Sequence, residues 1–599
     1  MKSISIYLSI FLSIFILHNA LGQDGGDAVY NKLIKEYTLK GDGSTEYREY
    51  KEIKLLSHMS FHRLYGETFI IYDPKFQELK INDAYTIMAD GKKVVVPDNA
   101  YNEVLPRAAA HAAPYNHLRE MVITHTGLEV GATIYLDYTL LSKPGYMQTF
   151  MGEEVIQDIV PIKEKKILIH IPEDKELHFK MLNIRTAPEI SADNGVKTYS
   201  FSFNAMSGST QEWGTDASLL PRLFFSTAKD LERAYFPFVG QKAFTLQLNQ
   251  SMKNAVSKLK EENEAGLDLA LAIQKMVIND IGRWRLSLEH TGFKCRTPEE
   301  VWASNAGTDL EKTVLLTSLL QEAGFRTAAY AIIPDRYYDK SVGSLYVMKG
   351  FAVQLRLEGE DIYLSAIHQQ NQDLAFGLNN TKLLILDGAI ESIRAINPVS
   401  LKTEIIYQGK FVNDENEKIK GKMSVKLVGS ANPYFGLLQD TAYAKKYAKG
   451  VQEVKLNILN HNESAFDLDI IQKNVFKEYG DYIFMGPPLS NNGVSSWGIS
   501  YIETGRRSPI KLKELITEKY YYTIELPDGY QLVSPSIDIN IENVIGSVKI
   551  SLKQEGNVIH ANREIQINKL MVGYSEFDAF SEIIEAWMNP SLQEIIFKK

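Results

Sequence analysis

The chain has 599 residues, more than one hydrophobic core can organise, so it should fold as several domains. Hydrophobic residues make up 45% of it and charged residues 23%, a balance that excludes an intrinsically disordered chain. The formal net charge of −9 argues against polyanionic partners, namely nucleic acids and anionic membrane surfaces.

The first segment of the chain has the pattern of a cleavable export signal. Lys2 precedes an apolar run over residues 4–17, and the small residues Ala20 and Gly22 stand where a signal peptidase reads. This run of about 14 residues is shorter than the roughly 20 that a membrane-spanning helix needs. We therefore expect residues 1–22 to be a signal peptide, with the mature protein in the periplasm or cell envelope, or secreted. No transmembrane segment is expected after cleavage.

Residues 23–244 read as short strands separated by turns. Polar and apolar residues alternate over 132–141. Asp-Gly at 90–91 and Asn-Gly at 194–195 are turn pairs of the kind that join hairpin strands. Repeated short strands with such turns predict an N-terminal β-sandwich domain.

The sequence offers little for metal or disulfide chemistry. Cys295 is the only cysteine, so an internal disulfide and a cysteine-rich metal cluster are both excluded. His111 and His117 stand close together, but no third ligand accompanies them, and we interpret them as loop histidines. No metal and no other cofactor is expected.

The pattern changes after the N-terminal domain, where helical spacing begins. Residues 245–398 are predicted to form an α+β domain in which helices come first and antiparallel strands follow. Residues 399–599 are predicted to form a C-terminal antiparallel β domain, because alternation is clear over 537–544 and 546–568. One helix is expected as an insertion between residues 429 and 475.

The stretch NAGTDLEKTVLLTSLLQEAGFRTAAYAI, residues 305–332, is the most informative motif. Thr308 and Glu311 have the spacing of a capping box, an apolar helix follows, and Gly324 ends it before a strand. Because this helix offers little polar surface, it should be the most buried helix of the middle domain. A helix start favours negative charge, so a cysteine placed there ionises readily. Here the position holds Asp309.

The domain order and this motif resemble an exported bacterial multidomain family. Its members have an N-terminal β domain of unknown function, a transglutaminase-like (papain-like) core and a C-terminal β domain of unknown function. Their helix start reads Gly-Asp-Cys-x-Asp-Lys, and residues 307–312 here read Gly-Thr-Asp-Leu-Glu-Lys. The resemblance implies a Cys-His-Asp triad, whose three positions hold Asp309, Gly350 and Ser365 in this chain. The core is therefore expected to be catalytically degenerate.

Three hypotheses about function follow. The first is an exported non-catalytic scaffold, a transglutaminase-like pseudoenzyme that binds an extended peptide, a glycan or an envelope protein in or near the degenerate cleft. The second is an active hydrolase with a non-thiol mechanism that uses Asp309 and Glu311. The third is a purely structural envelope protein.

Two further residues could in principle replace a member of the triad. Cys295 lies a whole helix before the nucleophile position, and we interpret it as an inert, partly buried thiol. His368 lies just past the third strand of the middle domain, and we interpret it as a surface histidine.

Overall fold

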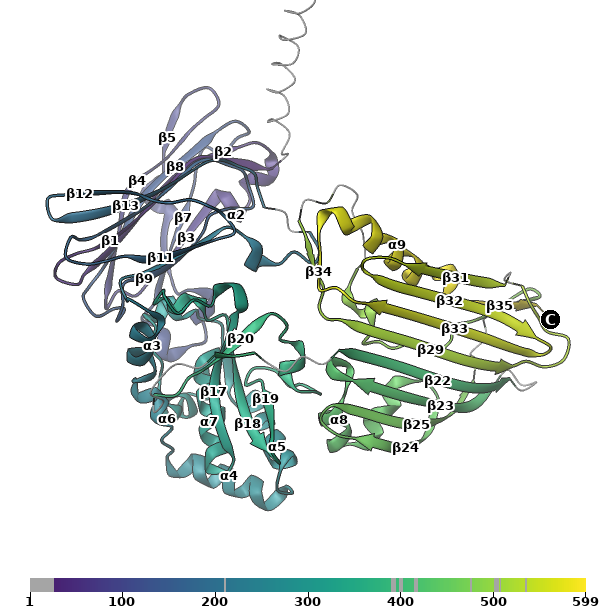
Figure 1. The fold of residues 1–599 in the computed structure, drawn as a ribbon. Coiled ribbons are helices and arrows are strands. Elements are labelled where there is room, and N and C mark those ends of the chain that lie inside the picture. The colour runs from purple at the N-terminus through teal and green to yellow at the C-terminus, as the bar shows by residue number, and fades with distance from the viewer. Residues whose placement is uncertain are drawn as a thin grey trace, which may run out of the picture.

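The computed structural model shows three parts that follow one another along the chain, coloured from purple through teal to yellow in Figure 1. It describes residues 26–209, 212–388, 395–397, 402–413, 418–473, 477–499, 506, 508–533 and 536–598. The predicted signal peptide lies outside these residues. Within the described ranges, no helix is both long and apolar enough to cross a membrane.

The N-terminal part is built on an eight-stranded sheet with the strand order β12-β13-β10-β1-β2-β8-β4-β5. In chain order its members are β1 (Ala28–Leu39), β2 (Thr45–Leu55), β4 (Gln77–Ile87), β5 (Lys93–Val95), β8 (Thr133–Ser142), β10 (Ile162–Pro172), β12 (Glu189–Asp193) and β13 (Val196–Met206). Neighbouring strands are antiparallel except β1 and β10, which run parallel.

Two three-stranded sheets form a second layer over the large sheet. One has the order β3-β7-β6 and the other β11-β14-β9. Their strands are β3 (Glu67–Tyr72), β6 (Tyr101–Val104), β7 (Arg119–Thr124), β9 (Met151–Val155), β11 (His178–Leu182) and β14 (Arg222–Ser226), and the short helix α2 (Arg63–Gly66) leads into β3. Ile70 of β3 packs with Leu136 of β8, and Phe225 of β14 packs with Phe201 of β13. The predicted N-terminal β domain is therefore confirmed as packed β-sheets.

Helices come first in the middle part. They are α3 (Leu231–Val239), α4 (Gln250–Glu262), α5 (Leu267–Asp280), α6 (Pro298–Ala303) and α7 (Asp309–Glu322). Two short parallel strands, β15 (Gly282–Trp284) and β16 (Ala306–Thr308), lead into α7. A five-stranded antiparallel sheet follows, in the order β19-β18-β17-β20-β21. Its strands are β17 (Arg326–Pro334), β18 (Gly350–Leu357), β19 (Glu360–Leu364), β20 (Thr381–Ile385) and β21 (Ala395–Ile396).

Helix α7 is the central element of this part. It buries 11 of its 14 residues, whereas α5, of the same length, buries seven. The buried hydroxyls of Thr317 and Ser318 are satisfied within the helix, since each donates a hydrogen bond to the carbonyl four residues earlier. This confirms the prediction that it is the most buried helix of the middle part.

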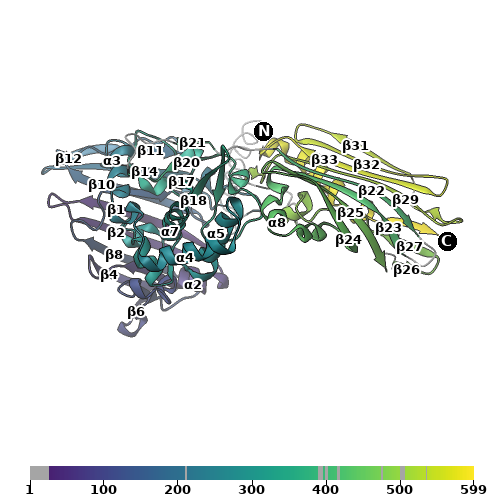
Figure 2. The same cartoon turned by 90° about the horizontal axis from the view of Figure 1, so that it is seen from below.

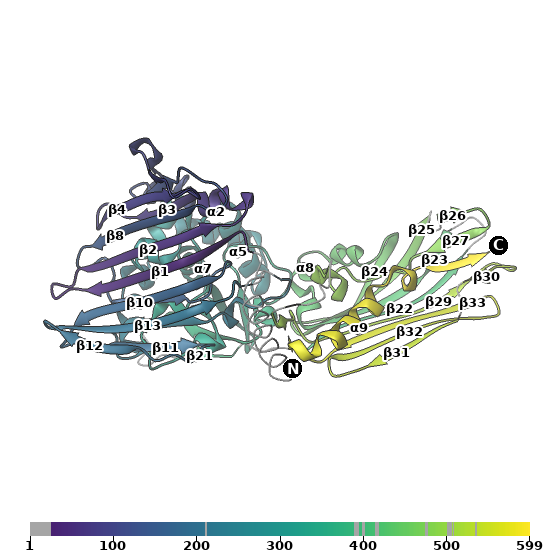
Figure 3. The same ribbon diagram turned by 90° about the horizontal axis from the view of Figure 1, so that it is seen from above.

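The C-terminal part is a second eight-stranded sheet, with the order β24-β25-β23-β22-β29-β33-β32-β31. Its strands are β22 (Thr403–Asn413), β23 (Lys418–Val428), β24 (Val451–Leu459), β25 (Glu463–Lys473), β29 (Ile516–Glu525), β31 (Ile537–Glu542), β32 (Gly546–Glu555) and β33 (Val558–Ile567). Helix α9 (Phe577–Met588) lies across one face of this sheet (Figure 3) and buries Phe580, Ile584 and Trp587. The C-terminal β domain is thereby confirmed.

Smaller elements complete the C-terminal part. A four-stranded sheet contains β26 (Lys477–Tyr479), β27 (Tyr482–Met485), β30 (Gln531–Leu532) and β35 (Ile595–Lys598), and β28 (Ile510–Lys511) pairs with β34 (Met571–Val572). The predicted inserted helix is α8 (Tyr434–Gln439). It lies beside α5 at the junction with the middle part (Figure 2), and its Phe435 is buried in the same core as Leu269.

The domain limits at residues 244 and 398 stay predictions. Helix α3, which precedes the first of these limits, packs in the same hydrophobic core as α7 and β17. That core also takes in Met151 and Phe224 from the N-terminal sheets. The N-terminal and middle parts are therefore joined by apolar packing, and residue 398 lies outside the described residues.

Candidate functional site

The start of α7 has the capping geometry that the sequence predicts. The Thr308 hydroxyl accepts a hydrogen bond from the backbone N–H of Glu311, and the Glu311 carboxylate accepts one from the backbone N–H of Thr308 at 2.9 Å. Both residues are buried. This reciprocal pair satisfies two donors that a helix start otherwise leaves without partners.

The Glu311 carboxylate is the hub of a buried polar cluster. The Arg296 guanidinium donates to both of its oxygens, at 3.0 and 2.9 Å, and the Arg296 backbone N–H donates at 3.1 Å. The Tyr115 hydroxyl, from the N-terminal part, donates to it at 2.6 Å. Trp284 closes the cluster, because its ring centroid lies 4.9 Å from the Arg296 guanidinium carbon. With every oxygen engaged and only 1% of the residue exposed, this carboxylate has no room for a substrate.

Asp309 is held by a different arginine. Arg283 of β15 donates from Nε to Oδ1 at 2.6 Å and from a terminal nitrogen to Oδ2 at 2.7 Å, a bidentate ion pair. The Asp309 side chain is 35% exposed. The residue that the resemblance places at the nucleophile position is thus a half-exposed partner of an arginine.

The other two triad positions lie at the same end of the middle part. Strand β17 starts where α7 ends and so runs back toward the helix start, which places the start of β18 and the end of β19 there as well. Gly350 begins β18 and pairs with Ile332, and it has no side chain to carry a proton. Ser365 is buried and its hydroxyl accepts hydrogen bonds from the backbone N–H groups of Ile367 and His368. The fold brings the three positions to the same end of the middle part, but each of them is hydrogen-bonded to different residues.

The remaining sequence candidates do not form a reactive set. The Cys295 thiol is partly buried, and burial raises its pKa well above the ordinary value, with the nearby Glu311 charge raising it further. His368 is exposed, and its Nδ1 lies 3.3 Å from the Ser365 hydroxyl. His111 and His117 lie in turns, as predicted. Among the described residues, no group of three or more His, Cys, Asp or Glu side chains is placed to hold a metal ion.

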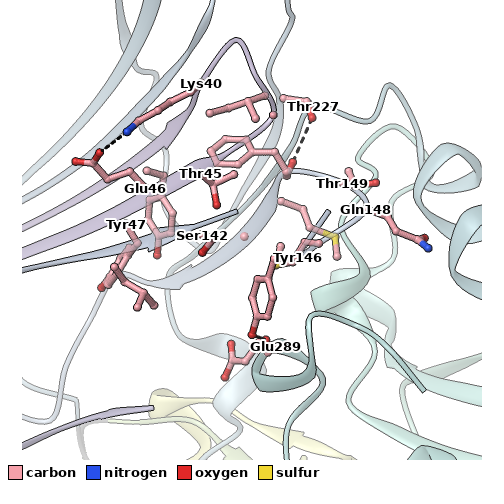
Figure 4. A pocket seen from close by; sticks show the side chains of 18 of the residues that line it. Lys40, Thr45, Glu46, Tyr47, Ser142, Tyr146, Gln148, Thr149, Thr227 and Glu289 are labelled. Carbon is pink, nitrogen blue, oxygen red and sulfur yellow. Dashed lines mark hydrogen bonds and ion pairs between the residues drawn. The ribbon is translucent and has the colours of Figure 1, made fainter. Parts of the chain in front are cut away.

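A large cleft of about 1380 Å³ opens elsewhere, between the N-terminal sheets and the middle part (Figure 4). Its floor comes from β1, β2 and β8 of the eight-stranded sheet, and β3 and β9 of the second layer border it. Middle-part residues Glu289, His290 and Tyr346 also line it. None of the four residues proposed from the sequence (Asp309, Glu311, Gly350 and Ser365) is among the described residues that line it.

The floor of the cleft is aromatic and charged at once. Lys35 Nζ lies 3.0 Å from a Glu154 oxygen that also accepts the Tyr37 hydroxyl, and Tyr47 donates to Glu49 at 2.7 Å. Burial acts to lower the pKa of Lys35, but the two carboxylates outweigh it and hold that pKa above the ordinary value. Lys35 therefore stays charged and paired, while the tyrosine rings supply contact area.

Charges along the cleft balance. Six basic residues line it (Lys35, Lys40, Lys143, Lys175, Lys229 and Arg233), and so do six acidic ones (Asp42, Glu46, Glu153, Glu154, Asp174 and Glu289). A site without a net charge offers no general attraction to either an anion or a cation. Its aromatic floor favours a ligand that is uncharged and partly apolar.

The amino-acid sequence does not predict this cleft. Its residues come from strands that are distant along the chain, such as β1 and β9, and no motif joins them. One usable signal existed within β1, where Lys35 and Tyr37 share the side of the strand that carries the buried Leu33. A lysine on the inner side of a strand is unusual and marks a polar interior.

Two known protein domains match the two outer parts of the chain. The domain of unknown function DUF3857 matches residues 41–208, and the domain of unknown function DUF3858 matches residues 481–597. The chain thus carries one domain of unknown function in each outer part, as the resemblance implied. No protein of curated function matches the chain.

One solved structure is similar over nearly the whole chain. It is described as "a putative protease" from Parabacteroides distasonis ATCC 8503, is 27% identical, and superposes with a TM-score of 0.74 over 96% of this chain and 99% of its own. An M1 zinc metallopeptidase from Deinococcus radiodurans is 11% identical, with a TM-score of 0.18 over 33% of this chain and 42% of its own, and this likeness carries no argument.

Proposed function

We propose that this protein is an exported, non-catalytic peptide-binding protein with a transglutaminase-like middle domain. The observation that carries the proposal is the difference between the start of α7 and the large cleft. At the start of α7 both acidic side chains are bound to arginines, whereas the cleft above β1, β2 and β8 is open and large. Binding in the cleft rather than chemistry at the helix start is the function this arrangement supports.

The triad positions support a non-catalytic reading. Acyl transfer through a thiol needs a thiolate, a base to move its proton and a group that orients the base. The chain has Asp309, Gly350 and Ser365 at these three positions, so none of the positions holds the group that acyl transfer needs there. The single thiol, Cys295, lies in a partly buried place where burial raises its pKa and so disfavours the thiolate.

The carboxylate hydrolase stays the second candidate. Such an enzyme needs one carboxyl group that gives up a proton to the leaving group and a second that acts across the substrate. Glu311 is enclosed by Arg296, Tyr115 and Thr308, and Asp309 is paired in bidentate fashion with Arg283. Neither carboxylate is free to transfer protons to or from a substrate, so the hydrolase hypothesis has less support than peptide binding.

A peptide is the ligand that best suits the cleft. The 27% identical relative from Parabacteroides distasonis carries the description of a protease, a class of enzyme that acts on peptide chains. The cleft is bordered by two β-strands and has no net charge, which suits a segment of uncharged polypeptide. A glycan and a folded envelope protein remain outcomes of the test, as does a purely structural role in which nothing binds.

The proposal is tested by separating turnover from binding. Purified protein is assayed for amine incorporation into glutamine substrates and for amide hydrolysis, with and without a thiol-blocking reagent, and is also screened against a random library of end-capped heptapeptides. We expect no turnover and retention of a subset of peptides.

A matched pair of variants locates the binding. Gln148→Trp fills the mouth of the cleft, where Gln148 is exposed, and Ser191→Trp adds the same bulk on the exposed edge strand β12. Peptide retention should fall in the first variant only. Turnover that is lost on thiol blocking, or lost in Asp309→Asn, would replace the proposal with one of the catalytic hypotheses.

A further inference from the structure

We infer that the cleft takes its peptide as an added β-strand, inserted between β3 and β9. This inference rests on the proposed function and specifies how the same site binds. Both strands are edges. Among the described strands, β3 pairs only with β7, and β9 pairs only with β14. Both also line the cleft, β3 through Phe69, Ile70 and Ile71 and β9 through Met151, Gly152 and Glu153.

The backbone of β3 has a set of groups that point away from its partner. The backbone N–H of His125 donates to the carbonyl of Gly66 at 2.9 Å, which continues the β3–β7 ladder by one residue. Because hydrogen-bonding direction alternates along a strand, Thr68, Ile70 and Tyr72 also face β7. The N–H and C=O groups of Phe69 and Ile71 therefore face the other way, toward the cleft.

The same reasoning applies to β9. The Phe150 carbonyl accepts from Thr227, and the Ile156 N–H donates to Pro221, so the even-numbered residues of this segment face β14. The backbone groups of Met151 and Glu153 then face the open edge. At Val155 the edge closes, because its carbonyl accepts a hydrogen bond from Lys165 Nζ at 2.6 Å.

The length and surroundings of the two edges define the ligand. Strand β3 has six residues and β9 has five, so a segment of about five residues would run along both. Its alternate side chains would face the floor, which carries Tyr37, Tyr47 and Tyr138. The ring centroid of Tyr47 lies 5.0 Å from that of Tyr37 and 6.0 Å from that of Tyr138. Apolar side chains suit that floor, and the balanced charges of the cleft suit an uncharged segment.

The placement of the two edges inside a cleft also shields them. An exposed strand edge is a template for aggregation unless it is covered or shielded. Here both edges line a cleft whose walls also include Glu289, His290 and Tyr346 of the middle part, so an extended segment can reach them more easily than a folded chain can. The edges are thereby reserved for a peptide, and a folded partner is disfavoured.

Backbone methylation of the peptide tests the inference on the unmodified protein. The tightest binders from the heptapeptide library are remade with one N-methyl group at each position in turn, which removes a backbone donor and keeps every side chain. Strand addition predicts an alternating pattern, in which methylation weakens binding by about tenfold at every second residue and by less than about threefold at the residues between. Hydrogen exchange of the segments containing β3 and β9 should slow when the peptide is bound.

Two proline variants of the protein provide a second test. Phe69→Pro removes an outward N–H from β3 and leaves the β7 pairing in place, so it should weaken peptide binding at least tenfold. Ile190→Pro makes the same change on the edge strand β12, outside the cleft, and should leave binding unchanged. Peptides that bind with no alternation on methylation would overturn strand addition and leave the proposed function standing. A library that yields no binder would overturn both.

Discussion

The hydroxyl of Tyr115 donates a 2.6 Å hydrogen bond to the carboxylate of Glu311, 196 positions later in the chain. Tyr115 belongs to a loop of the N-terminal part, whose Ala109, Ala112 and Leu118 pack against Trp284 and Ala306 of the middle part. The loop thus encloses Glu311 at the start of α7, and this buried carboxylate is part of the interface between the N-terminal and middle parts.

This contact should contribute measurably to stability. In Tyr115→Phe the ring still packs against Trp284, but Glu311 loses one of its donors. A hydrogen bond to a charged group contributes about 1.5–3 kcal/mol, so the first unfolding transition in urea should move to lower denaturant by a corresponding amount. A Tyr115→Phe variant with unchanged unfolding would show that the loop is not held by this bond.

The two acids of the first turn should behave very differently when they are removed. Glu311→Ala leaves the Arg296 guanidinium largely buried without its partner, and we expect a loss of about 3–5 kcal/mol. Asp309→Ala breaks a half-exposed ion pair and removes one helix-start charge, and should cost about 1 kcal/mol or less. Urea unfolding of the two variants side by side provides the measurement, and equal losses would contradict the assignment of Glu311 as the structural acid.

The thiol of Cys295 should react slowly. Burial raises its pKa, so little thiolate is present at neutral pH, and the sulfur lies 3.6 Å from the Arg296 carbonyl. We expect its labelling by a maleimide or an aromatic disulfide at pH 7.5 to be at least tenfold slower than in the urea-unfolded protein. Labelling at the rate of the unfolded chain would indicate an accessible, activated cysteine and would reopen the thiol hypotheses.

The features that the sequence predicts best are those whose parts lie close together along the chain. The two residues of the capping box, Thr308 and Glu311, are three positions apart, and the burial of α7 follows from its two Leu-Leu pairs, 315–316 and 319–320, which are separated only by small hydroxyl residues. The bond from Tyr115 to Glu311 could not be foreseen, because neither residue type is unusual where it stands and the contact depends on how two domains dock. The cleft is of the same kind, since β1, β3, β8 and β9 meet there only after the two layers have formed.

A buried histidine in the N-terminal part gives the protein a sensitivity to acid. His125 is only 3% exposed, and its Nε2 lies 3.0 Å from the Thr68 hydroxyl, which accepts a hydrogen bond from Lys51 at 2.9 Å. The Nδ1 atom of the same ring is buried without a hydrogen-bond partner among the described residues, so a doubly protonated imidazolium would carry a buried N–H with no acceptor. Burial lowers the pKa of His125 to about 3, and the nearby Lys51 charge lowers it further.

This arrangement predicts the sign of a pH effect. The folded-state pKa is depressed below the unfolded value of about 6.5, so between pH 6.5 and 3 the unfolded chain binds a proton that the folded chain does not. The stability contributed by neutral His125 is fully present above pH 6.5 and is lost progressively as the pH falls. At about 1.4 kcal/mol per pH unit, acidification to pH 4.5 should cost about 2–3 kcal/mol through this residue alone.

In His125→Gln the side-chain amide keeps a polar contact to Thr68 and does not titrate, so this part of the loss should disappear. The measurement is the free energy of the first urea transition for both proteins at pH 7.0 and pH 4.5. Equal losses on acidification would mean that the pKa of His125 is not depressed in the folded protein.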